Sequence, residues 1–373
     1  MELATIGVEE WLNVHERSAT TDIAQSTISS LTFDELLALD PQEGQTLLDE
    51  LHAAKLNYGW IEGSPAFKEA VADLYETVSP QHVLQMNGAT GANLNAMMAL
   101  VSPGDHVVVE YPTYTPLHEI PRAMGAEVSH WHLREELGWQ PDVEELRSLV
   151  RPNTRLICIN NASNPIGTVL WRETLLEIAE IAREVGAYVL SDEVYLPLED
   201  TERFASMVDL YERAVVTNSM SKTYSVPAAR IGWTVTRDAW LNDRLAHYRD
   251  HTLICGGVMG DLVATYVLRH RDAVLSRNRA IVLDNRAIAQ EWIDRTPRAR
   301  WVAPQGISTS YVQFDLPRDE TDEAFCLRLL EERGVLLVPG SRFELPCGAR
   351  LGYCCDEQTL RRGLQILGEA LAE

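Results

Sequence analysis

The chain has 373 residues, of which 46% are hydrophobic and 23% charged, a composition typical of a globular protein with one large and one smaller domain. Its 55 acidic and 32 basic residues give a net charge of −23, which argues against nucleic acid or an anionic membrane as partner. No stretch is long and apolar enough for a membrane span, and the N-terminus does not read as a signal peptide. We therefore expect a cytoplasmic protein that acts on small molecules.

Short apolar runs alternate with helical periodicities from about residue 80 onward. The runs predict strands at 83–87, 106–110, 128–133, 156–160, 187–191 and 214–218. Helical spacing predicts helices over 92–101 and 173–185. This alternation is typical of a mainly parallel sheet flanked by helices, an α/β fold.

The pattern changes after about residue 240. It is helical over 241–268 and 274–296, followed by strand candidates at 309–314, 335–338 and 349–353 and a last helix over 357–372. We predict a large domain formed by residues 46–280. A smaller, discontinuous α/β domain is predicted from residues 1–45 and 281–373.

The six cysteines are scattered and include no C-x-x-C pair. A metal site is therefore not expected, and free thiols in a reducing cytosol are.

Polar residues follow four of the predicted strands. Asn87-Gly88 follows the first strand, Asn164 the fourth, Asp192-Glu193 the fifth, and residues 219–222 the sixth. Ligands of parallel sheets bind at the carboxyl ends of the strands. The sequence therefore predicts one polar site at this edge of the sheet.

Several short motifs, in order along most of the chain, resemble those of the class I and II aminotransferases, which are fold-type I pyridoxal-phosphate enzymes. They are Tyr58 with Gly63 and residues 67–70, Gly88-Ala89-Thr90, Tyr111-Pro112-Thr113-Tyr114, Asn164-Pro165-Ile166-Gly167, Ser191-Asp192-Glu193-Val194-Tyr195, Ser219-Met220-Ser221-Lys222, Arg230-Ile231-Gly232 and Arg350-Leu351-Gly352. The resemblance implies a seven-stranded, mainly parallel sheet and pyridoxal 5′-phosphate as cofactor.

The resemblance implies that Lys222 holds the cofactor aldehyde as a Schiff base and later moves the proton between the substrate Cα and the cofactor C4′. An amine reacts in this way only when it loses its proton easily, which a partly desolvated pocket with a neighbouring cation allows. Asp192 is implied to keep the pyridine nitrogen protonated, so that the ring accepts electrons. Tyr195 and Asn164 are implied to bind the ring 3′-oxygen.

The phosphate group needs hydrogen-bond donors, and a small-residue loop that opens a helix supplies free backbone amides. Arginine adds a permanently charged guanidinium group, whose paired N–H donors match the geometry of a phosphate. By resemblance, the phosphate-binding residues are Gly88, Ala89, Thr90, Ser219, Ser221 and Arg230, with Tyr58 reaching in from a neighbouring subunit. The contribution of Tyr58 implies a homodimer with shared active sites.

The remaining implied roles concern the ring and the substrate. Tyr114 is implied to stack on the cofactor ring, and Arg350, with Asn164, to bind the substrate carboxylate. Two positions depart from the family pattern. Ala228 stands where glycine is frequent, and Ile166 replaces the threonine of N-P-T-G.

The resulting expectation is a transaminase that moves an amino group from an L-amino acid to a 2-oxo acid. An alternative is a capreomycidine synthase-like cyclase, an oxidase or a lyase, because residues 11–36 resemble the start of the capreomycidine synthase branch. Related arginine oxidases use a histidine in this segment, where the present chain has Ser26, Thr27, Ser29 and Ser30. A cofactor-binding transcriptional regulator is disfavoured, since no basic helix-turn-helix region precedes the motifs. The specificity pocket is expected from residues 23–29 and 57–61.

Overall fold

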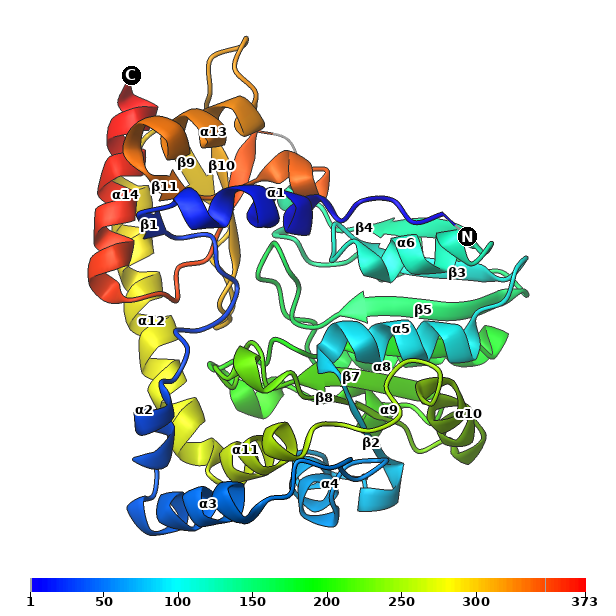
Figure 1. The fold of residues 1–373 in the computed structure, drawn as a ribbon. Coiled ribbons are helices and arrows are strands. Elements are labelled where there is room, and N and C mark those ends of the chain that lie inside the picture. Colours follow the sequence, from blue (N-terminus) through cyan, green and yellow to red (C-terminus); the bar gives the residue numbers. More distant parts are fainter. Residues whose placement is uncertain (1, 346) are drawn as a thin grey trace.

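The computed structural model describes residues 2–345 and 347–373, and its larger part is built around one seven-stranded sheet (Figure 1). The strand order is β2-β8-β7-β6-β5-β3-β4. Strands β3 to β7 run parallel, whereas β8 runs antiparallel to both of its neighbours, β7 and β2. The predicted mainly parallel α/β fold is confirmed. The strands are β2 (Val83–Met86), β3 (His106–Tyr111), β4 (Glu127–His132), β5 (Thr154–Asn160), β6 (Tyr188–Asp192), β7 (Ala214–Ser219) and β8 (Gly232–Val235).

Helices cover both faces of this sheet, as the nearly continuous burial of its central strands requires. Because side chains alternate along a strand, Val107 and Val109 of β3 pack in one core cluster and Val108 packs in another. The helices of this part are α2 (Phe33–Leu37), α3 (Pro41–Ala53), α4 (Pro65–Ala72), α5 (Gly88–Leu100), α6 (Pro116–Ala123), α7 (Val143–Leu149), α8 (Arg172–Val185), α9 (Met207–Leu210), α10 (Ala239–Arg249) and α11 (Val258–Arg269).

The smaller part has its own core around a four-stranded antiparallel sheet in the order β12-β13-β10-β9. A short parallel pair, β1 with β11, joins the N-terminal segment to it. Its elements are α1 (Gly7–His15), β1 (Thr21–Asp22), β9 (Ala299–Trp301), β10 (Ser310–Phe314), α13 (Asp322–Arg333), β11 (Val335–Leu336), β12 (Val338–Pro339), β13 (Gly348–Leu351) and α14 (Glu357–Ala372).

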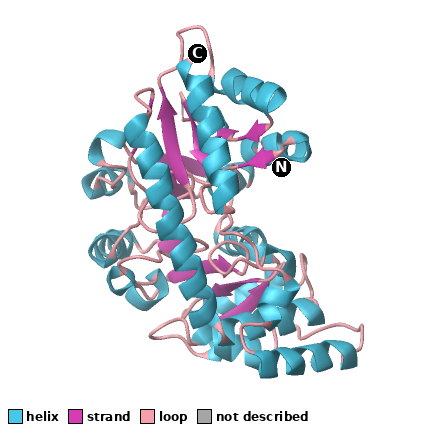
Figure 2. Cartoon of the chain, turned by 90° about the vertical axis from the view of Figure 1, so that its left-hand side faces the viewer, coloured by secondary structure: helices cyan, strands magenta, loops and turns pink. Residues whose placement is uncertain are grey.

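One long helix, α12 (Arg271–Arg295), connects the two parts and runs along both of them (Figures 1 and 2). Val274, in its first turns, packs in the core of the larger part, whereas Val282 and Ala289 pack in the core of the smaller part. The change of core therefore occurs within the helix. The predicted domain limits stay a prediction.

The predicted single helix over 241–268 is two helices, α10 and α11, separated by residues 250–257. In this connection, Gly256 allows a close approach of Gln85, since a Cβ there would lie 1.7 Å from Oε1 of Gln85. Strand β8 was not predicted because it is only four residues long and begins at Gly232, within the motif Arg230-Ile231-Gly232, which was interpreted as part of the phosphate site. Within residues 2–345 and 347–373, no helix is long and apolar enough to cross a membrane.

Candidate active site

The carboxyl ends of β5, β6 and β7 meet at one edge of the sheet. Asn160 of β5 pairs in register with Asp192 of β6, which in turn pairs with Thr217 of β7. A cavity of about 320 Å³ lies at this edge. Most of the predicted site residues line it, namely Ala89, Thr90, Tyr114, Asn164, Asp192, Tyr195, Ser219, Ser221, Lys222, Arg230 and Arg350.

Lys222 follows β7 and is partly exposed to this cavity. Its Nζ donates a hydrogen bond of 2.7 Å to Oγ of Ser26, a buried residue of the N-terminal segment. Burial, followed by the nearby positive charge of Arg350, lowers the pKa of Lys222 to about 8. The amine is therefore close to the protonation balance that a nucleophilic lysine needs.

Asp192 ends β6 and is buried. Its Oδ2 accepts a hydrogen bond of 2.7 Å from Nδ2 of Asn93, and its Oδ1 accepts one of 3.2 Å from the amide of Val194. Burial raises the pKa of Asp192 to about 6, opposed by these hydrogen bonds and by the charge of Lys222. These hydrogen bonds fix the orientation of the carboxylate. Because a buried charge without a partner is unfavourable, a cation bound beside Asp192 would be strongly stabilised.

The N-terminus of α5 is open toward the cavity. Asn87, the N-cap residue, makes no side-chain capping bond, so the first amides of the helix retain their capacity to bind an anion. Gly88 has φ +68°, and a Cβ there would lie 2.9 Å from Nη2 of Arg230. The glycine thereby gives the guanidinium room beside the helix start. Arg230 also donates to Oγ of Ser221 over 3.4 Å.

Arg350 of β13 brings the smaller domain to the site. It is buried, with Nη1 donating to Oδ1 of Asn164 (3.2 Å) and Nη2 donating to the carbonyl of Ala24 (2.9 Å). Its Nε, also buried, has no hydrogen-bond partner among the described residues. Burial lowers the pKa of Arg350. A buried guanidinium with an unused donor is suited to bind a carboxylate.

Two tyrosines complete the lining of the cavity. The hydroxyl of Tyr114 lies 3.4 Å from Oγ1 of Thr90, at the start of α5. Tyr195 is buried, which raises the pKa of its phenol to about 12, although Arg350 and Ser26 oppose the rise. Both phenols therefore remain protonated near neutral pH and are available as hydrogen-bond donors.

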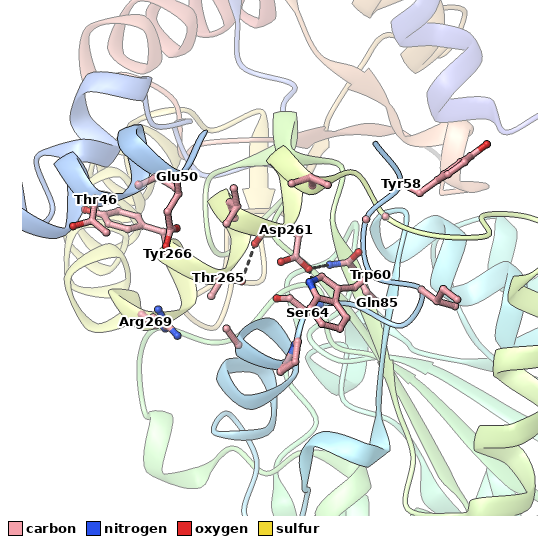
Figure 3. Close-up of a pocket in the computed structure, with 18 of the residues that line it drawn as sticks. Thr46, Glu50, Tyr58, Trp60, Ser64, Gln85, Asp261, Thr265, Tyr266 and Arg269 are labelled. Atoms are coloured by element: carbon pink, nitrogen blue, oxygen red, sulfur yellow. Dashed lines mark hydrogen bonds between the residues drawn. The ribbon is translucent and has the colours of Figure 1, made fainter. Parts of the chain in front are cut away.

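Gly88 adjoins the cavity, but the structure does not bring Tyr58 to it. The Tyr58 side chain is 82% exposed and lines a separate cavity of about 950 Å³ together with Trp60 and Ile61. Figure 3 shows the Tyr58 ring pointing away from Asp261 and the other labelled residues of that cavity. Residues 57–61 therefore do not contribute to the site within one chain.

The structure adds residues that the motifs did not identify as site residues. Asn93 and Asn160 contact or line the site, as do Val8, Glu9, Leu12 and Asn13 of α1 and Glu16 directly after it. Gln25 and Ser26, which belong to the segment 23–29 expected to form the specificity pocket, also line the cavity. The sequence does show polar residues at the helical spacing i, i+4 and i+7, namely Glu9, Asn13 and Glu16. It does not show what this face of the helix covers.

The two departures from the family pattern have different surroundings. Ile166 is buried and packs with Leu133, Trp139 and Tyr311, so an apolar side chain suits this position. Ala228 is exposed in a short 3-10 helix, where its methyl group does not crowd the core.

The chain is similar to known proteins along most of its length. A sequence model of the family "Aminotransferase class I and II" matches residues 41–367. The solved structure of a PLP-dependent aminotransferase from Streptococcus suis is 50% identical, with a TM-score of 0.96 over 100% of this chain and 98% of that one. Capreomycidine synthase of Streptomyces vinaceus is 32% identical over 98% of this chain and 93% of its own. The PLP-dependent cyclase OrfR is 28% identical, with a TM-score of 0.89 over 100% of this chain and 98% of its own.

Proposed function

Because the chain belongs to the class I and II aminotransferase family, whose enzymes depend on pyridoxal 5′-phosphate, we propose that it transfers an amino group from an L-amino acid to a 2-oxo acid. One observation carries the proposal. Lys222, Asp192 and Arg350 line one cavity, which brings a reactive amine, a carboxylate and a guanidinium within reach of one small ligand.

The residues present fit the cofactor. The uncapped start of α5, with Ser219, Ser221 and Arg230, offers backbone amides, hydroxyls and a cation for its phosphate group. Asp192 would bind the ring nitrogen, and Lys222 would bind the aldehyde carbon. When bound, the cofactor supplies an electron sink for the carbanion formed at the substrate Cα.

The chain's own groups would then orient the substrate and move its proton. Arg350 would bind the α-carboxylate and so hold the Cα–H bond beside Lys222, which has the lowered pKa required of a base. Asn164 and Tyr195 would bind the ring 3′-oxygen, and Tyr114 would lie against the ring face. These residue roles are proposals that follow from the family motifs and from the shared cavity.

A homodimer is part of the proposal. Leu56, Tyr58, Trp60 and Ile61 form a run of exposed side chains on the larger domain, with exposures between 62% and 90%. Such a concentration of exposed apolar surface is typical of a protein interface. A second copy seated there would cover it and carry Tyr58 toward the partner's phosphate site. We also propose a cytoplasmic location, in keeping with the free cysteines.

The second candidate is a cyclase or another reaction of the same cofactor. It is favoured by the similarity to capreomycidine synthase along 98% of the chain and by the similarity to OrfR. Both candidates begin with removal of a proton from Cα, so the residues above serve either. They differ in whether the amino group leaves the substrate.

Product analysis separates the two candidates. Purified holoenzyme is incubated with single L-amino acids and pyruvate, and 2-oxo acid, alanine, ammonia and oxygen uptake are measured together. Transamination predicts equal amounts of 2-oxo acid and alanine, with no ammonia and no oxygen uptake. A product that keeps its amino nitrogen, or release of ammonia, would show that the transaminase proposal is wrong.

A further inference from the structure

Helix α5 reaches the candidate cofactor site at two points. Its first turn, with Ala89 and Thr90, lines the cavity, and Asn93, one turn further along, donates a hydrogen bond to Asp192. The helix packs against β6, which ends at Asp192, and against β7, which leads to Lys222 (Figure 1). The element proposed to bind the cofactor phosphate therefore also contacts the carboxylate proposed to bind the ring nitrogen.

Three buried polar side chains form a chain of hydrogen bonds beside the cavity. Oγ1 of Thr217 donates to Oδ1 of Asn93 over 2.6 Å, and Nδ2 of Asn93 donates to Oδ2 of Asp192 over 2.7 Å. Thr217 and Asn93 are 0% exposed and Asp192 is 2% exposed. Because solvent does not reach these groups, each of them depends on its neighbour in the chain for its hydrogen bond.

The direction of the two bonds depends on the charge of Asp192. An ionised carboxylate only accepts hydrogen bonds, so Asn93 must turn its NH₂ group toward Asp192 and its carbonyl oxygen toward Thr217. A protonated carboxyl also donates, and an amide that receives this bond turns its carbonyl oxygen away from Thr217. In the described part of the chain, Oδ1 of Asn93 is the one hydrogen-bond partner of the Thr217 hydroxyl. The reversed arrangement would take this acceptor away from a buried hydroxyl, which is unfavourable.

We propose that Asn93 and Thr217 are positioning residues for the cofactor ring: the Thr217 hydroxyl fixes the orientation of the Asn93 amide, and this amide holds Asp192 in its ionised form. An ionised Asp192 accepts from a protonated ring nitrogen, the state in which the ring withdraws electrons. The inference rests on the role proposed above for Asp192. It adds that two side chains that do not line the cavity set the charge of this carboxylate.

The surroundings of Asp192 agree with this assignment. Burial raises the pKa of Asp192 to about 6, and the hydrogen bond from Asn93 is the largest of the influences that lower it, followed by a backbone amide and the charge of Lys222. Tyr114 and Tyr195 also lie within electrostatic range of Asp192, but burial raises the pKa of both phenols, so they stay neutral. Asn93 is thus the side chain on which the charge of Asp192 depends most.

The test compares the cofactor with its deaza analogue, in which C–H replaces the ring nitrogen. Dissociation constants of pyridoxal 5′-phosphate and of the deaza analogue are measured by fluorescence titration of the full-length, cofactor-free chain, without an amino acid. The ratio of the two constants reports on the bond between Asp192 and the ring nitrogen, because the two ligands share their phosphate and aldehyde groups. We expect the wild type to prefer the cofactor about 30-fold, and Asp192→Ala to bind both ligands about equally.

Variants that keep the size of the side chain assign the preference to the two positioning residues. Asn93→Leu removes the donor to Asp192 and should lower the preference about tenfold, and Thr217→Val, which removes only the hydroxyl, should lower it about fivefold. Thr217→Ser keeps the hydroxyl and should retain the wild-type preference. Because Thr217 acts through Asn93, adding Thr217→Val to Asn93→Leu should lower the preference no further.

Thr234→Val is the matched control. Thr234 pairs in register with Thr217 on the neighbouring strand β8 and is equally buried, but its hydroxyl has no hydrogen-bond partner among the described residues. The same substitution there should change neither dissociation constant by more than twofold.

A second measurement reports on the ring itself. Cofactor that carries ¹⁵N in its ring is bound to each variant, and the ¹⁵N resonance distinguishes a protonated from a neutral ring nitrogen. We expect a protonated nitrogen in the wild type, Thr217→Ser and Thr234→Val, and a shift toward the neutral form in Asn93→Leu and Thr217→Val. Residues that only packed α5 against the sheet would affect the binding of both ligands alike and leave this resonance unchanged.

Two results would overturn the inference. One is a wild type that binds both ligands equally, which would also contradict the role proposed for Asp192. The other is a preference that Asp192→Ala loses but that Thr217→Val or Asn93→Leu keeps, which would leave the proposed site intact and refute the positioning role alone. Should Asn93→Leu fail to fold, the comparison of Thr217→Val with Thr217→Ser decides by itself. Neither result depends on whether the enzyme transaminates, because no amino acid is present.

Discussion

Replacing Ser26 by alanine should make Lys222 lose its proton at lower pH. Lys222 Nζ donates to Ser26 Oγ over 2.7 Å, and the pKa of the amine is already lowered to about 8 by burial. The hydroxyl accepts from the amine, so it stabilises the charged form more than the neutral form. Removing it should therefore lower the pKa further.

The size of the change follows from the strength of one charged hydrogen bond. Such a bond contributes about 1.5–3 kcal/mol, and one pKa unit corresponds to about 1.4 kcal/mol. Because Lys222 is partly exposed to the cavity, water recovers part of this energy, and we expect a fall of about one unit. At pH 7 the neutral fraction of the amine would rise from about a tenth to about a half.

The assay uses the cofactor-free protein, so that it reports on the amine alone. The protein is acylated briefly over a range of pH, and modification of Lys222 is quantified by peptide mass spectrometry. The chain has only two other lysines, Lys55 and Lys68, which serve as internal references. Ser26→Ala should acylate about fivefold faster than wild type at pH 7.

Two variants control the experiment. Ser26→Thr keeps the hydroxyl and should retain the wild-type midpoint, and Ser30→Ala makes the same change at an exposed position of the same segment. A midpoint for Ser26→Ala that is unchanged or higher, or that Ser30→Ala reproduces, would refute the reasoning. A rise would mean that the hydroxyl donates to a neutral amine.

Four further predictions concern the site and the segment that packs against it. Lys222→Ala should abolish turnover, measured as 2-oxo acid formation. Asp192→Ala should still bind the cofactor, as seen by its absorbance, but its rate of turnover should fall roughly 100-fold or more. Normal turnover in either variant would contradict the role proposed for that residue. Gly88→Ala should weaken cofactor binding about tenfold in fluorescence titrations, since a side chain at φ +68° is strained by about 1–2 kcal/mol and its Cβ would crowd Arg230. Gly352→Ala should lower the free energy of unfolding in urea by about 2–4 kcal/mol, because its Cβ would lie 1.7 Å from the carbonyl of Gln25; an unchanged midpoint would mean that the N-terminal segment shifts freely.

The part of the site predicted from sequence consists of residues at the ends of strands. Asp192 and Lys222 follow short buried runs, and their neighbours along the chain fix where the side chains go. Strand alternation and the topology of a parallel sheet then bring these ends together. Their meeting in one cavity could be predicted because the geometry is local to each strand end and is repeated at each one.

The residues that were missed depend on long-range packing. Asn93 reaches Asp192 because α5 packs against β6 and β7. Ser26 lies in the segment expected to line the pocket, but its hydrogen bond with Lys222, across 196 positions of sequence, was not predicted. Glu9 lines the site only because α1 packs against the smaller domain. From sequence, a polar residue on an amphipathic helix is expected to face solvent, and only the packing of the helix shows that it faces a site instead.

The N-terminal segment connects Arg350 and Lys222, the two residues proposed to bind the substrate carboxylate and to move its proton. Ala24 accepts from Arg350, and Ser26, two residues further on, accepts from Lys222. A substrate carboxylate that binds Arg350 shares a guanidinium with the Ala24 carbonyl, so it acts on the same short stretch of backbone that positions the amine. Gly352 fixes this stretch, since only a residue without Cβ lets the backbone of Gln25 approach so closely. Arg350 and Gly352 therefore stand close together in the sequence for a structural reason: Arg350 is proposed to bind the carboxylate, and Gly352 lets the segment that hydrogen-bonds to Lys222 pack closely.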